Sequence, residues 1–183
     1  MKRTLIGELT PEEHSKISGW ALKIRDTKYM VFIILKDRSG KIQVSIDKKN
    51  QEDLVKKLEG VLPSSVLSFT GKMVLSEYVK DGGKEFLPED LEILSRSDVL
   101  PLDETANIDT RMDYRWIDLR SEKNNLMLKV QSKFVQGMRE FLLNNDFTEI
   151  HTPKLIGAAS ESGSEVFEVK YFDRPAYLAQ SPQ

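Results

Sequence analysis

The order of extended and helical stretches between residues 16 and 95 restricts the possible folds more than any other feature of the chain. Three extended stretches rich in β-branched and aromatic residues come first, then one stretch with helical spacing, then two more extended stretches. The strands are predicted over 16–25, 29–37, 41–47, 65–77 and 85–94, and the helix over 51–60. Three strands, a helix and two strands is the order of the OB-fold, a small barrel whose face binds oligonucleotides. We therefore predict an all-β OB-fold barrel with one helix.

A second region with a different apolar period follows the predicted barrel. The polar, non-periodic stretch 98–110 is predicted to be a linker. After residue 120, large apolar residues recur at steps of three and four, which is typical of an amphipathic helix. These are Leu126, Val130, Phe134, Met138, Phe141 and Leu142. Residues 147–156 are then predicted to be extended, with Pro153 near the far end, where a missing N–H costs least.

Composition excludes several kinds of site and location. The 183 residues include no Cys, so disulfides and cysteine-ligated zinc or iron–sulfur sites are absent. The N-terminal stretch "MKRTLIGELTPEEH" lacks the apolar core of a signal peptide, and the longest purely apolar run, residues 30–35, is far too short to span a bilayer. We therefore expect a soluble cytoplasmic protein that does not bind a membrane.

Charge is spread unevenly along the chain, although the net charge is only −2. Residues 16–57 carry eleven Lys or Arg and five acidic residues, which gives this segment a local charge of +6. A basic segment in an acidic protein is typical of a face that binds a polyanion. A solvated strand surface has the same composition, and charge alone does not separate the two interpretations.

Several catalytic and metal-binding motifs are missing from the sequence. It contains no Gly-rich phosphate loop before a helix and no Gly-x-Ser-x-Gly nucleophile elbow. His14 and His151 are far apart in the sequence, and each lacks a nearby His, Cys or paired carboxylate at ligand spacing. The sequence therefore predicts no metal site.

Three other stretches have side chains suited to binding. On the predicted barrel, Phe32 has a ring for stacking on a base, Arg25 suits a phosphate or base edge, and Gln43 suits a base edge. Because the run around Phe32 is apolar throughout, spacing alone favours a core position for this residue. The other two stretches are the small-residue loop 158–167, whose carboxylates suit an ammonium group although solvated loops of this kind are commoner, and the terminal "QSPQ", whose amides suit a small polar substrate.

Taken in this order, these stretches resemble those of aspartyl-tRNA synthetases of the kind found in archaea and some bacteria. The stretches that carry the resemblance are "ISGWALKIRD" (17–26), "DRSGKIQVSI" (37–46), "DTRMDYRWIDLR" (109–120), "DFTEIHTPKLIGAASESGSEVF" (146–167) and "YLAQSPQ" (177–183). "EIHTPKL" resembles motif 1 of class II synthetases, a long helix followed by a strand ending in a proline. "QSPQ" separates the aspartyl enzymes from the related asparaginyl and lysyl ones. The resemblance implies an OB-fold anticodon-binding domain over 1–97, a linker or hinge over 98–120, and the start of an α+β class II catalytic domain over 121–183.

The same resemblance implies that the barrel binds tRNA. Phe32 matches the aromatic residue that stacks on an anticodon base, and Gln43 matches a base-edge reader on the next strand. Arg25 matches the Arg that touches the anticodon stem-loop. The loop 79–84 between the last two barrel strands is where we expect discrimination between aspartate and asparagine anticodons.

For the catalytic domain, the resemblance implies part of an aspartate pocket. Glu161 matches the carboxylate that receives the ammonium group of aspartate, and Gln183 matches a pocket glutamine, with Ser181 beside it. One departure is Ser162, which stands where the family has a glycine and restricts the backbone of the loop. Motif 1, with Pro153, lies at a two-fold interface in the family, so we expect a homodimer.

What the family places after this point is missing from the sequence. The missing parts are motifs 2 and 3, whose arginines bind ATP, and the Arg that pairs with the side-chain carboxylate of aspartate. Activation is an attack of a carboxylate on the α-phosphate of ATP, which rests on positioning and on cationic stabilisation. We therefore expect a portion of an aspartate–tRNA ligase that uses ATP and Mg²⁺ when complete, and no activity from these 183 residues alone. The alternative is a naturally short paralogue that binds RNA or a protein partner and catalyses nothing.

Overall fold

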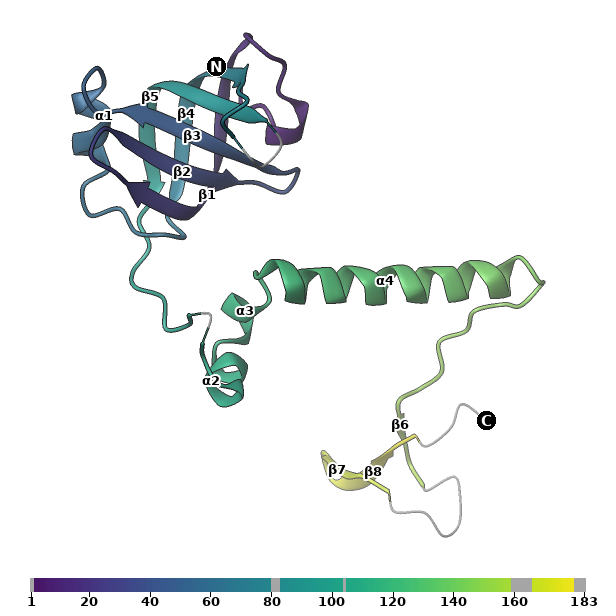
Figure 1. The fold of residues 1–183 in the computed structure, drawn as a ribbon. Coiled ribbons are helices and arrows are strands. Elements are labelled where there is room, and N and C mark those ends of the chain that lie inside the picture. The colour runs from purple at the N-terminus through teal and green to yellow at the C-terminus, as the bar shows by residue number, and fades with distance from the viewer. Residues whose placement is uncertain (1, 80–82, 104, 159–165, 180–183) are drawn as a thin grey trace. The chain divides into compact units, whose positions relative to one another are not determined.

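The computed structural model of the chain consists of two compact units, Met1–Tyr114 and Arg115–Gln183 (Figure 1). The residues that the structure describes are 2–79, 83–103, 105–158 and 166–179. Within these residues no helix is long and apolar enough to cross a membrane.

A closed barrel forms most of the first unit (Figure 1). The elements of the barrel are η1 (Ile6–Glu8), β1 (His14–Asp26), β2 (Met30–Lys36), β3 (Lys41–Asp47), α1 (Glu52–Lys57), β4 (Val66–Leu75) and β5 (Lys84–Ser95). The strand order is β1-β2-β3-β5-β4, and β4 pairs back with β1. Strands β3 and β5 run parallel, and the other neighbours run antiparallel. This order of elements and strands confirms the predicted OB-fold.

The barrel interior is filled by alternate residues of each strand. In β2, Val31, Ile33 and Leu35 are buried, whereas Phe32 and Ile34 are half-buried between them. Because side chains of a strand alternate between its two faces, one face of β2 packs into the core and the other lies outside. The core also includes Ile17, Val44, Ile46, Leu67, Phe69, Met73 and Phe86, each no more than 1% exposed.

Two glycines allow barrel strands to approach each other closely. A Cβ on Gly19 would lie 2.3 Å from the carbonyl oxygen of Lys36, and one on Gly71 would lie 2.2 Å from that of Leu87. The register between β4 and β5 also shifts between Thr70 and Gly71. Irregularities of this kind bend and twist strands, which helps a sheet to close into a barrel.

The buried carboxylate of Asp37 fastens the N-terminal segment to the turn between β2 and β3. It accepts hydrogen bonds from the backbone N–H groups of Ile6 (3.0 Å), Ser39 (2.7 Å) and Gly40 (3.1 Å), and from the Ser39 hydroxyl (2.6 Å). The Arg3 guanidinium lies 3.6 Å away. Burial raises the pKa of this carboxyl, but the hydrogen bonds from Ser39, Ile6 and Gly40 lower it, and the net result is a lowered pKa.

The predicted linker contains the start of a helix. Helix α2 (Ile108–Asp113) begins inside the stretch 98–110. The side chain of Asn107 accepts a hydrogen bond from the backbone N–H of Thr110 at 2.9 Å, which is the arrangement of a helix N-cap. The sequence prediction missed this helix because it relied on apolar periodicity, which the stretch lacks. The capping residue Asn107 marks where the helix begins.

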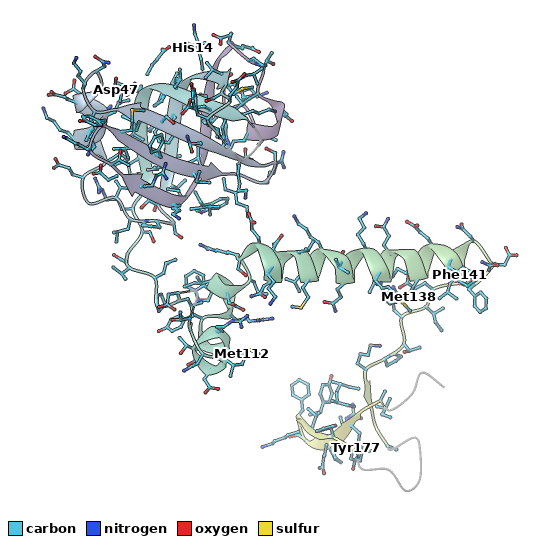
Figure 2. The ribbon with its side chains drawn as sticks, viewed as in Figure 1. His14, Asp47, Met112, Met138, Phe141 and Tyr177 are labelled. Atoms are coloured by element: carbon cyan, nitrogen blue, oxygen red, sulfur yellow. The ribbon has the colours of Figure 1, made fainter. Side chains whose placement is uncertain are left out.

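In its described residues, the second unit contains two helices and a small sheet. They are α3 (Arg115–Asp118), α4 (Glu122–Leu143), β6 (Leu155–Ile156), β7 (Glu168–Tyr171) and β8 (Arg174–Leu178), with the strands in the antiparallel order β6-β8-β7. Helix α4 confirms the predicted amphipathic helix, and Ser121 caps its first turn. Its apolar stripe is exposed in this unit, including Met138 and Phe141 near its C-terminal end (Figure 2).

The extended segment predicted over 147–156 forms a strand only at Leu155–Ile156. Residues 147–154 pair with no strand in the part of the chain that the structure describes. Within the described residues, Leu155 and Ile156 pair with β8, and the carbonyl of Lys154 accepts one further bond, from the N–H of Ala179. The segment predicted to be extended thus forms a paired strand only at its end, and Pro153 lies exposed two residues before β6.

Candidate nucleic-acid interface

Neighbouring strands β1, β2 and β3 bring the three predicted RNA-binding residues to one outer face of the barrel. Arg25 on β1 lies opposite Phe32 on β2, and Ile34 on β2 lies opposite Gln43 on β3. Because Phe32 and Ile34 are two residues apart on one strand, they share a face. The face therefore combines a cation, an aromatic ring and an amide, while their roles in binding remain predictions.

Phe32 and Arg25 form a stacked pair on this face. The guanidinium carbon of Arg25 lies 4.7 Å from the centroid of the Phe32 ring. The ring is half-buried, and its neighbours Val31 and Ile33 occupy the core instead. The interpretation of Phe32 as a core residue is therefore wrong. A ring and a guanidinium plane are both surfaces on which an RNA base is able to stack.

The amide of Gln43 is held by two polar side chains beside it. Its Nε2 donates to the Ser45 hydroxyl and to Oε1 of Glu85, both at 3.3 Å. The Ser45 hydroxyl in turn donates to the same Glu85 oxygen. Ser45 is 3% exposed, and Glu85 reaches the cluster because β5 runs parallel to β3 with Glu85 opposite Gln43.

Two hollows open on this face, and Arg25, Ile34 and Gln43 line both. The smaller, of about 150 Å³, is completed by Lys23 and Phe32. The larger, of about 350 Å³, is completed by Lys41 and Ile42 of β3 and by Tyr78 and Val79 from the loop between β4 and β5. The two hollows give the face room for flat groups on both sides of Gln43.

The charges of the basic segment are not spread evenly around the barrel. Lys16 pairs with Glu92 at 3.1 Å, Lys57 pairs with Asp90 at 2.8 Å, and Lys48 pairs with Asp26. Lys23, Arg25 and Lys41 line the two hollows around Phe32 and Gln43. Both interpretations of the basic segment 16–57 therefore apply in part. Some of its cations pair with surface carboxylates, as on a solvated strand surface, and others surround the candidate binding site.

Sequence reasoning missed several residues of this face. Glu85 was not predicted, because its link to Gln43 depends on a parallel strand pair formed by residues about forty positions apart. Ser45 is two residues from Gln43 on β3, and strand alternation would have placed it on the same face. Tyr78 lies one residue before the loop 79–84 that the sequence singled out, and it is 96% exposed. Its position next to that loop was the one available signal.

The predicted aspartate-binding residues Glu161, Ser181 and Gln183 lie outside the described residues, as does Ser162. The structure does describe the strand that leads toward the last two. In β8, Tyr177 pairs with Ile156 of β6, and beyond it the N–H of Ala179 donates to the carbonyl of Lys154 at 2.9 Å. The aspartate-binding roles of Glu161, Ser181 and Gln183 therefore stay predictions.

The two histidines lie in different surroundings. His14 Nε2 lies 2.5 Å from Oε2 of Glu89 on the barrel surface, where Figure 2 labels it, and His151 is exposed. Among the residues that the structure describes, no three His, Asp or Glu side chains come together as a metal site would require.

Comparisons with protein families match the two parts of the chain separately. A model of the OB-fold nucleic acid binding domain matches residues 16–94. A model of class II tRNA synthetases (D, K and N) matches residues 107–183. Together the two matches include the barrel face and the whole of the second unit.

Curated relatives match the chain over nearly its whole length. An aspartate–tRNA(Asp/Asn) ligase of Methanopyrus kandleri is 39% identical and aligns with 100% of this chain and 44% of its own length. An aspartate–tRNA(Asp) ligase of Pyrococcus furiosus is also 39% identical, over 96% of this chain and 42% of its own. A solved structure of asparaginyl-tRNA synthetase from Pyrococcus horikoshii, complexed with asparaginyl-adenylate, is 27% identical with a TM-score of 0.87 and covers 100% of this chain and 43% of its own. The chain thus spans less than half the length of these relatives.

Proposed function

Because this chain belongs to the aspartate–tRNA ligase family of class II tRNA synthetases and matches its N-terminal part, we propose that it is the anticodon-binding barrel and the first part of the catalytic domain of an aspartate–tRNA ligase. We assign the barrel to residues 1–97, a hinge to 98–120 and the catalytic part to 121–183. The complete enzyme activates aspartate with ATP and transfers it to tRNA.

The observation that carries this proposal is the outer face on which Arg25 stacks over Phe32 beside Gln43. In the proposed complex, an anticodon base stacks on the Phe32 ring, Gln43 meets the pairing edge of a base, and Arg25 meets the anticodon stem-loop. A stacked base contributes about 1–3 kcal/mol, and Lys and Arg add a salt-dependent attraction to phosphates. Lys23 and Lys41 beside these residues support the electrostatic part.

For the second unit, we propose that Glu161 binds the ammonium group of aspartate and that Gln183 and Ser181 line the same pocket. The exposed apolar stripe of α4, together with Pro153, supports a homodimer interface, since an apolar helix face needs another surface to cover it. We further propose that the protein is cytoplasmic and does not bind membranes.

ATP and Mg²⁺ are the cofactors that the family implies. The described residues offer no cluster of metal ligands, and the sequence contains no stretch that matches the ATP-binding arginines of motifs 2 and 3. We propose that the complete enzyme uses both, and we assign no ATP or Mg²⁺ contact to the described residues.

The proposal is tested by titrating the chain with an RNA stem-loop that carries an aspartate anticodon. Replacing Phe32→Ala should weaken binding about ten- to a hundredfold, because one stacked base is lost, and raising the salt should weaken it further. Phe172→Ala is the matched control, since Phe172 is 80% exposed in the second unit and should leave affinity unchanged. Equal affinities for the unaltered chain and Phe32→Ala would contradict the proposed site.

A further inference from the structure

We propose that the N-terminal segment 2–13, which we call the strap (purple in Figure 1), braces the barrel across its shortest strand pairing and thereby sets how tightly the barrel binds RNA. The inference rests on the proposed function, since RNA affinity is what it predicts. It concerns a segment at the end of the barrel that makes none of the contacts proposed with RNA.

The first half of the strap is fastened to the turn between β2 and β3. The N–H of Ile6 donates to the carboxylate of Asp37 at 3.0 Å, and the N–H of Gly7 donates to the Ser39 hydroxyl at 2.8 Å. The side chain of Ile6 is 5% exposed and belongs to the barrel core. Because the turn leads directly into β3, the strap helps to determine where β3 begins.

The second half of the strap is fastened to β4. Leu9 is buried and also belongs to the barrel core. Beyond it, Pro11 forms a bridge with Met73, and the N–H of Glu12 donates to the carbonyl of Met73 at 2.9 Å. Met73 lies two residues before the end of β4. The strap therefore joins the turn before β3 to the end of β4.

These two attachments lie on either side of the shortest pairing in the barrel. Strand β5 lies between β3 and β4. It is paired with β4 along its whole length, but with β3 at two positions only, Gln43 with Glu85 and Val44 with Phe86. A pairing with so few backbone hydrogen bonds opens more easily than a long one. A second connection across it, such as the strap, therefore contributes most at this place.

Both attachments also lie next to residues that line the larger hollow of the candidate interface. Lys41 and Ile42 follow the turn that the strap holds, and Tyr78 and Val79 follow the strand end that it holds. A ring such as that of Tyr78 stacks on a base, and a cation such as Lys41 attracts a phosphate. Two such groups bind one ligand well only when their separation is fixed by the scaffold. The strap supplies a connection that fixes it.

If the closed strap favours the RNA-bound form of the hollow, RNA must in turn favour the closed strap. Two equilibria that are coupled in this way change each other by the same factor, which is typically about 5- to 150-fold. Detaching the strap should therefore weaken RNA binding, and RNA should make the strap open less often. A segment that only stabilises the fold would show neither effect in a chain that remains folded.

The first test detaches the strap in the 183-residue chain and measures its affinity for the aspartate stem-loop. Ile6→Glu places a charge at a buried position, and this charge reaches water only if the strap leaves the barrel. Binding should weaken about tenfold. Thr10→Glu is the matched control, because it adds the same charge at an exposed position of the strap, and should change the affinity less than about twofold. Hydrogen exchange resolved by segment should show fast exchange over 2–13 and slow exchange in β2 and β3 of Ile6→Glu.

The second test needs no variant. Adding the stem-loop to the unaltered chain should slow the amide exchange of Ile6 and Gly7 about tenfold. The amide of Lys49 is the internal control, since it donates to Asp47 at 2.9 Å in the turn after β3 and should exchange at an unchanged rate.

The outcomes separate the strap from the RNA-binding site. Equal exchange of the strap amides with and without RNA, or equal affinities for Thr10→Glu and for Ile6→Glu with its strap detached, would overturn the role of the strap and leave the RNA-binding site standing. If no stem-loop binds the unaltered chain, the proposed function fails and this inference fails with it. The exchange measurement on the unaltered chain decides the outcome if Ile6→Glu does not fold.

Discussion

Both units of the chain have apolar patterns, alternate residues in the barrel strands and steps of three and four in α4, but with opposite results. Among the described residues, the buried apolar side chains belong to the first unit, except Ile117 and Ala176. Phe134 and Phe141 of α4 are 69% and 67% exposed, although they follow a regular helical stripe. A closed barrel encloses the inner faces of its own strands, whereas a single helix with one apolar face needs another element to cover it. An amphipathic pattern therefore makes a core only where the topology supplies the opposite surface.

This difference in packing bears on the RNA-binding role proposed for the barrel and on the catalytic role proposed for the second unit. The barrel face around Phe32 is built on strands whose other side is a closed core, so its side chains are held by a rigid scaffold. In the second unit, α4 and the small sheet leave much apolar surface exposed, which a further part of the protein or a second subunit would cover. We therefore expect RNA binding to be the property that this chain retains on its own.

The largest expected effect is the loss of stability when a buried phenylalanine of the barrel is removed, compared with an exposed phenylalanine of the second unit. Phe69 is fully buried in the barrel, so Phe69→Ala should lower the free energy of unfolding by about 3–5 kcal/mol. Phe134→Ala, on the exposed stripe of α4, should change it by less than about 0.5 kcal/mol. Urea unfolding measures both, followed by Trp20 fluorescence for the barrel, in a Trp116→Phe background, and by the helical circular dichroism signal of α4 for the second unit.

The comparison would break if the two substitutions had similar effects. A large loss of stability from Phe134→Ala would mean that the stripe of α4 is already covered, for example in a dimer of this chain. Sedimentation of the same samples would then show the dimer, and the variant would dissociate it.

The barrel was predictable from the sequence because its signals are local. Turn residues such as Gly40 separate runs of strand-forming residues, and the helical spacing of Leu54 and Leu58 interrupts them once, so the order of elements alone selected the topology. The face taken by Phe32 was not predictable, because the run around it is apolar on both faces of β2. The Glu85 contact with Gln43 was not predictable either, since a local pattern does not indicate which distant strand becomes a neighbour.

The second unit was predicted less well for a related reason. The stripe of α4 is a property of one continuous segment, and the helix forms as expected. The extended segment over 147–156 depends on partners to form a strand, and in the described residues only Leu155 and Ile156 pair with β8. Elements that depend on a neighbouring segment are thus the ones that sequence patterns place least reliably.

A smaller effect is expected from the carboxylate that ties down the N-terminal segment of the barrel. Asp37→Asn replaces an acceptor of four hydrogen bonds with an amide that has one acceptor atom, and should cost about 1–3 kcal/mol. Asp118→Asn is the matched change in the second unit, where Asp118 pairs with Arg115 at 2.8 Å. It should leave the barrel transition unchanged, as measured by Trp20 fluorescence in the same background.

The same carboxylate predicts a direction for pH dependence. Because folding lowers the pKa of Asp37, its stabilising contribution is complete above the pKa of the unfolded chain, about 3.9, and is lost as the pH falls through the lower folded-state pKa. Between pH 6 and about pH 3, the stability of the unaltered chain should therefore fall more than that of Asp37→Asn. Parallel pH profiles for the two proteins would contradict this role of Asp37.

The smallest expected effect is a gain of stability confined to the second unit. Gly137 lies inside α4, and a Cβ there would meet nothing within 4 Å. Gly137→Ala should therefore stabilise the helix by about 1 kcal/mol, because glycine loses more backbone freedom on folding than alanine does. In the barrel, replacing glycine by alanine should instead lower the stability, since a Cβ on Gly71 would lie 2.2 Å from the carbonyl oxygen of Leu87. Hydrogen exchange resolved by segment should show slower exchange over residues 122–143 in Gly137→Ala and an unchanged barrel, whereas Gly71→Ala should speed exchange in β4 and β5. If Gly137→Ala also slowed exchange in the barrel strands, the two units would be coupled, and the contrast between a self-sufficient barrel and a dependent helix would have to be given up.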